Sequence, residues 1–378
     1  MPRALLRLIC VLWAVAGARA ATPMATLRIG RIDYLRAADV AGRLNLRMRW
    51  LSSRQLELAD SAHRLELPVD GRDASLDGLR LFLGEPALTR SGQLYLSRID
   101  YERRLRPLLR PEQEGSPPGH PRIIALDPGH GGSDHGTENP RLHLMEKTFT
   151  LDVAFRLKKL LEAQGDLVVM TRTNDSRFAN DQRVDLPLRG EFANQRHADL
   201  FVSIHFNSAA PDTRTRGTEV FSFAPRYQRS SDSWQRREDD SEPNPRYPDL
   251  SPANRNDAWS VLLAHAMHGE LIHSLHTEDR GEKIAHWAVL RPLDCPGILV
   301  ESAFLSNDAE AERVANPAFR QQIAEAMLAG IQAYGAELGR LRPAPGPAHA
   351  ASPGGIDPPG APARPPLPGT LEPPQRPS

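Results

Sequence analysis

Two histidines and two glutamates of this 378-residue chain could form a catalytic site, judged from their residue types and their positions in the sequence. Each lies where a predicted strand ends, in a turn, or at the start of a predicted helix. Two histidines and one carboxylate form a ligand set of catalytic zinc sites, which keep one position open for water. A further carboxylate beside such a site can take a proton from that water. The four residues, which together predict a zinc hydrolase, are His130, Glu146, His205 and Glu301.

The first histidine, His130, lies in the turn Asp-Pro-Gly-His-Gly-Gly, directly after a short apolar run. Glycines let the backbone turn tightly and approach a ligand closely, although a surface turn that happens to carry a histidine is the alternative. Glu146 begins the next predicted helix, where the helix dipole also favours an acid. His135 and His143 lie in the loop between them and are alternative ligands. The glycine and lysine spacings of phosphate-binding loops are absent from the sequence.

The second histidine, His205, ends the apolar run 200–204, and a histidine at the end of a buried strand is costly unless it is paired or liganded. Asn207 could orient a ligand, bind amide groups of a substrate, or close the turn. Glu301 follows the apolar run 297–300. A carboxylate in such a place has a raised pKa or a charged partner, and both suit a general base. An ion pair with an arginine is the structural alternative for Glu301.

Two residues near Glu301 resemble nucleophiles but lack the surroundings of one. Cys295 is followed by Pro296 and has no committed base beside it, which favours a plain turn residue. Ser302 lacks the Gly-x-Ser-x-Gly turn of a serine hydrolase. The metal-dependent reading of the sequence is therefore favoured over covalent catalysis.

The stretch from residue 122 onward must position these side chains. Apolar runs alternate there with segments whose apolar residues recur at helical spacing, which predicts a mostly parallel, twisted sheet covered by helices on both faces. Sites on such sheets lie beyond the carboxyl ends of the strands, so three strand ends should bring His130, His205 and Glu301 together. The predicted strands are 123–126, 167–171, 200–204, 218–223 and 298–301, and the predicted helices are 146–161, 188–198, 259–275 and 317–338.

Residues 24–108 precede this part as a separate unit. Short apolar stretches alternate there with turn residues, which predicts a small, mostly β domain built of hairpins. Within it, residues 37–46 have helical spacing, and Gly-Glu-Pro at 84–86 predicts a turn between two strands. The unit contains no cluster of histidines, cysteines or acids that could host chemistry. Prolines and glycines over 109–121 predict a linker to a catalytic domain at 122–340.

Two further segments have compositions unlike that of a packed core. Residues 226–258 are polar and charged with several prolines, which predicts a long surface insertion. Residues 341–378 are rich in proline, glycine and alanine and show no periodicity. Such a segment cannot bury enough apolar surface to order itself, so a disordered tail is predicted.

The amino terminus has the pattern of an export signal. Residues 1–20 begin with Arg3 and Arg7, continue with an apolar run too short to span a membrane, and end in Ala-Arg-Ala. Its removal would leave Cys295 as the single cysteine, without an internal disulfide. Lys+Arg and Asp+Glu both number 47, so no net charge points to nucleic acid or an anionic membrane. We expect an exported protein without a membrane span, periplasmic or secreted.

Residues 122 to about 334 resemble the zinc-dependent N-acetylmuramoyl-L-alanine amidases of the amidase-3 family. The resemblance implies zinc ligands at His130, Glu146 and His205, a catalytic carboxylate at Glu301, and hydrolysis of the amide bond between N-acetylmuramic acid and L-alanine in peptidoglycan. Residues 78–100 also resemble part of a small amino-terminal domain of some copper amine oxidases and cell-wall amidases, without copper ligands. The matching runs of the amidase family are 126–132, 146–147, 171–172, 199–207, 216–217, 280–281 and 299–307.

The chain departs from this family in two places. Ser302 replaces the glycine that usually follows the catalytic glutamate, and the insertion 226–258 separates two motifs. In some relatives an inserted helix blocks the site until an activator protein removes it, but this insertion has little helical periodicity, so we predict a mobile loop that faces the substrate. The alternatives are another zinc amide hydrolase acting on cell-wall material, or a wall-binding protein without activity.

Overall fold

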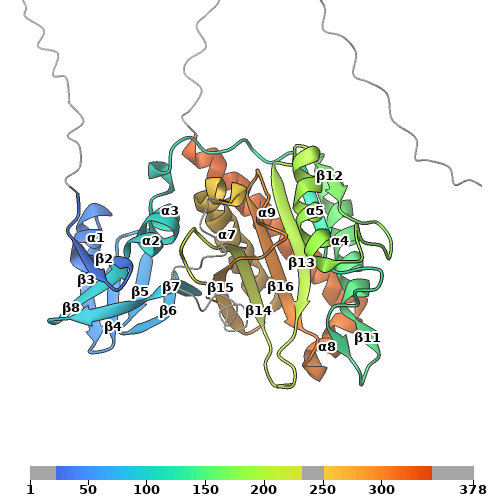
Figure 1. The fold of residues 1–378 in the computed structure, drawn as a ribbon, viewed down its shortest axis with the longest axis horizontal. Coiled ribbons are helices and arrows are strands. Elements are labelled where there is room, and N and C mark those ends of the chain that lie inside the picture. The colour runs from blue at the N-terminus through green and yellow to red at the C-terminus, as the bar shows by residue number, and fades with distance from the viewer. Residues whose placement is uncertain (1–22, 232–250, 343–378) are drawn as a thin grey trace, which may run out of the picture. The chain divides into compact units, whose positions relative to one another are not determined.

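The computed structural model describes residues 23–231 and 251–342 (Figure 1). The predicted export signal, the central part of the predicted insertion and nearly all of the predicted tail lie outside these residues. Among the helices of the described residues, none is both long and apolar enough to cross a membrane.

The predicted α/β fold is confirmed by a sheet whose strands from residue 122 onward stand in the order β12-β9-β13-β16-β14-β15. All neighbours in this series are parallel except β14 and β16. The carboxyl ends of β9, β13 and β16 therefore meet the amino ends of β14 and β15 at one edge. The strands are β9 (Ile123–Pro128), β12 (Leu167–Met170), β13 (Leu200–Asn207), β14 (Thr218–Phe223), β15 (Asp279–Ala285) and β16 (Gly297–Phe304), and β10 (Glu138–Asn139) and β11 (Leu144–Met145) form a separate hairpin.

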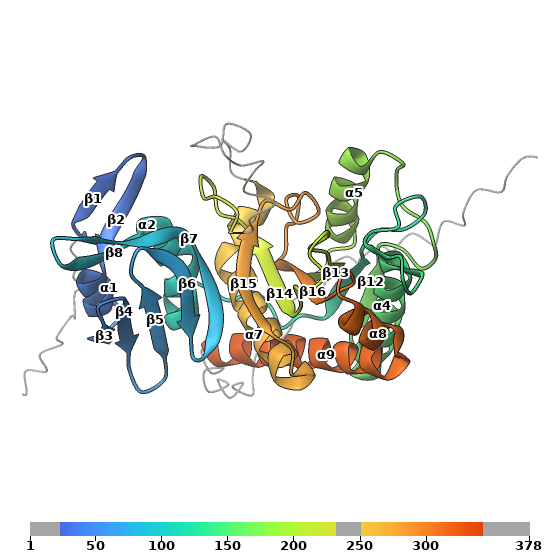
Figure 2. The same ribbon diagram turned by 90° about the horizontal axis from the view of Figure 1, so that it is seen from below.

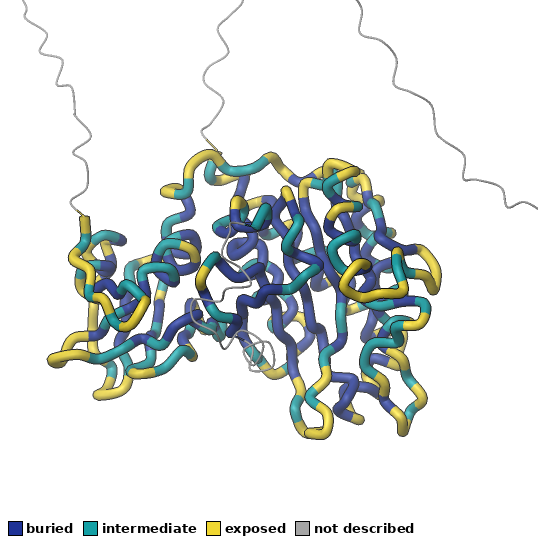
Figure 3. Tube along the Cα trace, in the orientation of Figure 1, coloured by how far each residue is buried: buried dark blue, intermediate teal, exposed yellow. Residues whose placement is uncertain are grey.

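Helices cover both faces of this sheet (Figure 2). Alternate residues of β13 point to opposite faces, so Val202 and Ile204 join the larger core, whereas Phe201 joins the smaller one. Strands β13 and β16 are buried along most of their length (Figure 3). The larger core contains residues of α4 (Glu146–Ala163), α7 (Asp257–Leu275), α8 (Asp308–Ala315) and α9 (Pro317–Leu341), and the smaller core contains a residue of α5 (Gln182–Gln195).

The predicted β structure of residues 24–108 is present, and its helix α1 (Ala37–Arg43) lies within the predicted range. The predicted turn at 84–86 is wrong, because β7 continues through it. The buried carboxylate of Asp100 accepts hydrogen bonds from the backbone nitrogens of Gly84 (2.7 Å) and Glu85 (3.0 Å), which satisfies these groups inside the strand. The strands are β1 (Thr26–Ile29), β2 (Ile32–Arg36), β3 (Arg47–Ser52), β4 (Gln55–Ala59), β5 (Arg64–Pro68), β6 (Gly71–Leu76), β7 (Leu79–Arg90) and β8 (Gln93–Ser97).

Strand β7 also lies beside β15, with Leu81 opposite Glu282, so the sheet continues from the central strands into the amino-terminal region. Strand β15 was not predicted from the sequence because its residues are mostly charged. Their charges are compensated inside the fold, as the buried Glu282 accepts a 2.6 Å hydrogen bond from Nδ1 of His265 on α7. Between the two regions lie α2 (Arg98–Asp100), the π-helix η1 (Tyr101–Leu105), α3 (Arg106–Leu109) and the short helix η2 (Pro111–Gln113).

Several predicted boundaries differ from the observed ones. Helix α5 was predicted at 188–198 but begins at Gln182, because Asp181 caps it by accepting a hydrogen bond from the backbone nitrogen of Arg183 (2.9 Å). Strands β13 and β16 each continue three residues past their predicted ends. Helix α8 was not predicted.

The described ends of the predicted surface insertion are packed, so the prediction is wrong for them. Gln228 is 2% exposed and donates a 2.7 Å hydrogen bond to the carboxylate of Asp100. On the other side, the short helix η3 (Pro252–Asn256) buries Ala253 in the smaller core. The burial of these two ends was not predicted because the segment as a whole is polar and charged.

Candidate metal site

His130, Glu146 and His205 converge at the sheet edge formed by the carboxyl ends of β9 and β13. One ligand atom of each residue lies within 4.8 Å of the others. Glu146 stands between the rings, with Oε2 3.1 Å from Nε2 of His130 and Oε1 3.0 Å from Nδ1 of His205. The carboxylate side chain of Glu146 is 3% exposed and the histidine side chains are 19% and 16% exposed, so the group opens to solvent on the histidine side.

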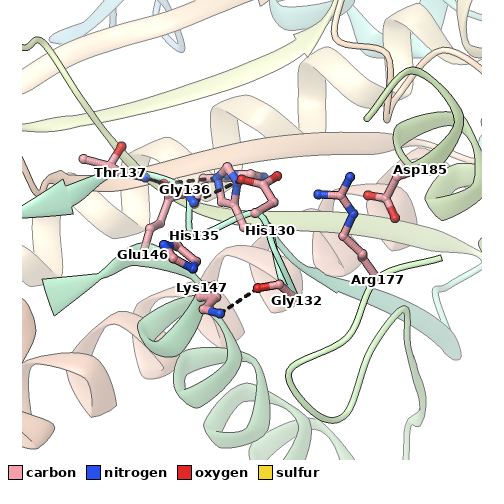
Figure 4. A network of polar contacts seen from close by, with 12 residues as sticks. His130, Gly132, His135, Gly136, Thr137, Glu146, Lys147, Arg177 and Asp185 are labelled. Carbon is pink, nitrogen blue, oxygen red and sulfur yellow. Dashed lines mark hydrogen bonds and ion pairs between the residues drawn. The ribbon is translucent and has the colours of Figure 1, made fainter. Parts of the chain in front are cut away.

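Backbone contacts hold the Glu146 carboxylate in place at the start of α4. Oε2 accepts a 2.8 Å hydrogen bond from the nitrogen of Thr137 (Figure 4), and Oε1 accepts one of 2.9 Å from the nitrogen of Phe206 on β13. The backbone nitrogen of Glu146 in turn donates to the carbonyl of Thr137. These contacts join the loop after His130 to the start of α4 and to β13, so the three candidate ligands are mutually oriented.

Glycines make room for the ligand side chains. A Cβ atom at Gly129 would lie 2.2 Å from Cε1 of His205, and one at Gly136 would lie 2.5 Å from Oε2 of Glu146 and 2.6 Å from Cδ2 of His130. His130 itself adopts φ +64°, a left-handed conformation that costs a non-glycine residue energy.

Two buried arginines hold the turn that carries His130. Arg189 of α5 donates to the carbonyl of His130 (2.9 Å) and forms ion pairs with Asp185 (2.8 Å) and Asp127 (2.9 Å). Arg172, after β12, donates to the carbonyls of Pro128 and Gly129, both at 2.9 Å. Sequence reasoning did not identify these positioning residues. Arg172 lies in one of the runs that match the amidase family, at 171–172. The partners of Arg189 could be identified only from the folded structure.

The electrostatics of the group favour an anionic Glu146 beside a cationic His130. Burial disfavours a charged His130, but Glu146 and Asp134 outweigh it and raise the pKa of His130 to about 10. Burial likewise disfavours ionised Glu146, but the two histidines hold its pKa far below the usual range. The hydrogen bond to His130 lowers the pKa of Asp134 to about 2. A cation bound here would replace the His130 proton in balancing these carboxylates.

Glu301 lies beside the group but does not belong to it. In the parallel pair of β13 and β16, Glu301 stands opposite His205, and in the antiparallel pair of β16 and β14 it stands opposite Glu219. Residues directly opposite each other share one face of a sheet, so the 8% exposed Glu301 lies on the same face as His205. This placement suits a base that acts next to a metal.

Asn207, the predicted substrate contact, has both ends of its amide engaged. Nδ2 donates to Oε2 of Glu219 (3.1 Å), and Oδ1 accepts a 2.7 Å hydrogen bond from the nitrogen of Ser208. These contacts close the turn after β13, which was one of the three roles considered for it. A contact with substrate stays a prediction.

The other candidates from the sequence lie outside the group. His135 pairs with Glu138 at 2.8 Å and is partly exposed, and His143 is exposed. Cys295 is buried, and burial raises the pKa of its thiol to about 12, which keeps it protonated and unreactive. Ser302 is fully buried within β16, where its small side chain is accommodated.

The residues present fit a divalent cation. Two imidazoles and a carboxylate are a donor set used by catalytic zinc, and the glycines leave the space that the converging side chains need. Among the described residues, this is the one group of histidines, cysteines and acids close enough together to hold a metal ion.

Comparison with known proteins now identifies the family. The profile of a family described as N-acetylmuramoyl-L-alanine amidase matches residues 124–333, more than half of the chain. The chain belongs to this amidase family. The matched region contains His130, Glu146, His205 and Glu301. It does not include the amino-terminal strands β1–β8.

Individual amidases are similar to the chain over much the same region. N-acetylmuramoyl-L-alanine amidase AmiC of Escherichia coli is 34% identical over 256 residues, which cover 61% of this chain and 58% of AmiC. The germination-specific amidase of Bacillus subtilis is 31% identical over 58% of this chain and 81% of its own length. A crystal structure of an amidase from Clostridium difficile is 27% identical, covers 57% of this chain and 97% of that one, and has a TM-score of 0.45. The match thus spans little more than half the length of AmiC.

Proposed function

We propose that this family member hydrolyses the amide bond between N-acetylmuramic acid and L-alanine in peptidoglycan. The observation that carries the proposal is the convergence of His130, Glu146 and His205 at one sheet edge, with Glu301 opposite His205 on the same face. We assign the metal as Zn²⁺, held by the two histidines and Glu146, because their donor atoms match its preferred ligands.

When bound, the metal would supply Lewis acidity, which would lower the pKa of water in the site from about 16 towards about 7. Glu301 accepts the proton of the attacking water on its carboxylate and returns it to the leaving nitrogen of L-alanine. Arg172 and Arg189 keep the His130 turn fixed, so that the ligand set keeps its geometry while substrate binds.

We further propose that the protein is exported, because peptidoglycan lies outside the cytoplasmic membrane and residues 1–20 have the pattern of an export signal. Peptidoglycan is then its partner, and no nucleic acid is required. An activator protein becomes necessary only if the insertion blocks the site. Deletion of residues 233–249 tests whether the insertion inhibits the enzyme, and it spares both packed ends of the insertion. Release from autoinhibition would strongly raise the rate of peptidoglycan hydrolysis.

Digestion of purified peptidoglycan by the full chain after export-signal removal tests the activity. Mass spectrometry should detect stem peptides with a free L-alanine amino terminus, and chelation should abolish them. Glu301→Gln should lower the rate about 10²- to 10⁴-fold while zinc binding is kept, as expected for a lost general base. Glu162→Gln, at the far end of α4, is the matched control. Zinc binding without any released product, even after deletion of 233–249, would contradict the proposal and favour a wall-binding protein.

A further inference from the structure

A groove with a volume of 360 Å³ lies at the same sheet edge as the candidate metal site. It is formed where β14 and β15 begin. Three arginines and two carboxylates line it, so positive charge is in excess. The lining residues are Asp212, Arg214, Thr215, Arg216, Glu278 and Arg280.

The groove and the candidate site are connected through Glu219. Nε of Arg280 donates a 2.7 Å hydrogen bond to Oε1 of Glu219, whose side chain is 2% exposed. Glu219 stands directly opposite Glu301 in the sheet. Arg280 on β15 and the proposed base on β16 are therefore separated by one strand, β14, a distance that a substrate bound at both places can span.

Arg280 is held in a defined position. Its chain lies over Gly217, where a Cβ atom would come 2.9 Å from Cγ of Arg280. Its guanidinium lies 5.1 Å from the centre of the Phe304 ring. Lys283 shares Oε1 of Glu219 at 2.8 Å and helps to fix it. Nη1 of Arg280 is 3.9 Å from Glu278, beyond hydrogen-bonding distance, and both residues line the groove.

The other two arginines form only loose contacts with the acids of the groove. Arg214 is 93% exposed and 3.6 Å from Asp212, and Arg216 is 66% exposed and 3.4 Å from Glu278. Exposed ion pairs of this kind contribute little, so a ligand can replace them at low cost. Guanidinium groups match the geometry of a carboxylate, which accepts two parallel hydrogen bonds.

We propose that this groove binds a carboxylate of the stem peptide, on the carboxyl-terminal side of the scissile amide. The inference rests on the proposed function. Sugar hydroxyls carry no charge, whereas the stem peptide carries free carboxylates, so the arginines select the peptide rather than the glycan. The peptide then lies over β14 and β15, and the glycan extends from the metal site away from them.

A pair of soluble muramyl peptides tests the proposal. They differ only in the residue after L-alanine, which carries either a free α-carboxylate or its primary amide. Wild type should cleave the free acid with a kcat/KM about 10-fold higher, mainly through KM, as expected for one lost charge-assisted hydrogen bond. Arg216→Gln should reduce this preference, and Glu278→Gln should increase it because a competing acid is removed. Equal kcat/KM for the two substrates in wild type would overturn the proposal.

Arg255→Gln is the matched control. Arg255 is 68% exposed and pairs with Asp294, just before the amino end of β16, at the opposite edge of the sheet. This variant should keep the wild-type preference. If Arg216→Gln weakens both substrates equally, the groove does not recognise the carboxylate.

Binding separates this inference from the proposed function. Calorimetric titration of zinc-loaded Glu301→Gln with the free stem peptide and its amide should show about 10-fold tighter binding of the acid. Arg216→Gln in that background should reduce the difference. Equal affinities refute the groove even if the chain is an amidase. A preference for the acid in a chain that cleaves no muramyl amide would support the groove and refute the reaction.

Discussion

Substitution of Gly129 by alanine should damage the metal site and leave the fold intact. Gly129 follows β9 and has an ordinary backbone conformation, since it is not among the residues with positive φ. Its effect is therefore one of space alone. The added methyl group would lie 2.2 Å from Cε1, 2.5 Å from Nε2 and 2.6 Å from Nδ1 of His205.

The expected size follows from these distances. Relief of a 2.2 Å contact to an ordinary distance of about 3.4 Å requires the His205 ring to move by about 1 Å. Metal–ligand distances tolerate only about ±0.2 Å, so the ring can no longer complete the site. We expect the affinity for zinc to fall at least as much as it does after loss of a supporting contact, which is about 10- to 100-fold.

Zinc affinity is measured by competition with a chromophoric chelator, and folding by thermal unfolding of the metal-free protein. Gly339→Ala in α9, where nothing lies within 4 Å of the added atom, is the matched control and should keep full affinity. A Gly129→Ala protein that binds zinc as tightly as wild type would refute the assignment of His205 as a ligand. A variant that fails to fold would show instead that the close packing between Gly129 and His205 is structural.

Two further substitutions probe buried charge. Burial raises the pKa of Asp257 from 3.8 to about 7, so the folded state binds this proton more tightly than the unfolded chain. The resulting stabilisation is complete below about pH 4 and is lost as pH rises to about 7. Urea unfolding should show that the free energy of unfolding of wild type, relative to that of Asp257→Asn, falls by on the order of 4 kcal/mol across this window. Asp185→Asn leaves the buried Arg189 without one of its carboxylates and should cost about 3 kcal/mol or more, with weaker zinc binding because Arg189 also holds the His130 carbonyl.

The candidate site could be predicted because its residues coincide with breaks in the local pattern. His205 interrupts an apolar strand, and His130 stands among glycines, so residue type and place point to the same conclusion. Asp134 and Arg189 could not be found in this way. An acid in a polar loop and an arginine in an amphipathic helix are ordinary residues until the fold brings them to His130.

The missed elements share a physical cause. Strand β15 has the charged sequence of a surface loop, yet its side chains are neutralised by partners far away in sequence, such as His265 for Glu282. The turn predicted at 84–86 failed for the same reason, because Asp100 supplies hydrogen bonds that no local pattern reveals. Sequence periodicity records the average burial of a segment, and it cannot record which distant group compensates a buried charge.

The continuity of β7 with β15 changes how the amino-terminal region can be studied. Wall targeting by residues 24–108 stays a prediction, and removal of the region is the obvious test. However, removal would take away Arg104, which is fully buried and donates 2.8 Å to the carbonyl of Glu282, and would leave the buried Gln228 without Asp100. Unsatisfied buried groups of this kind cost about 1–3 kcal/mol each. Lost wall association in a deletion variant would therefore report damage to β15, two strands from the strand of the proposed base, as readily as lost targeting.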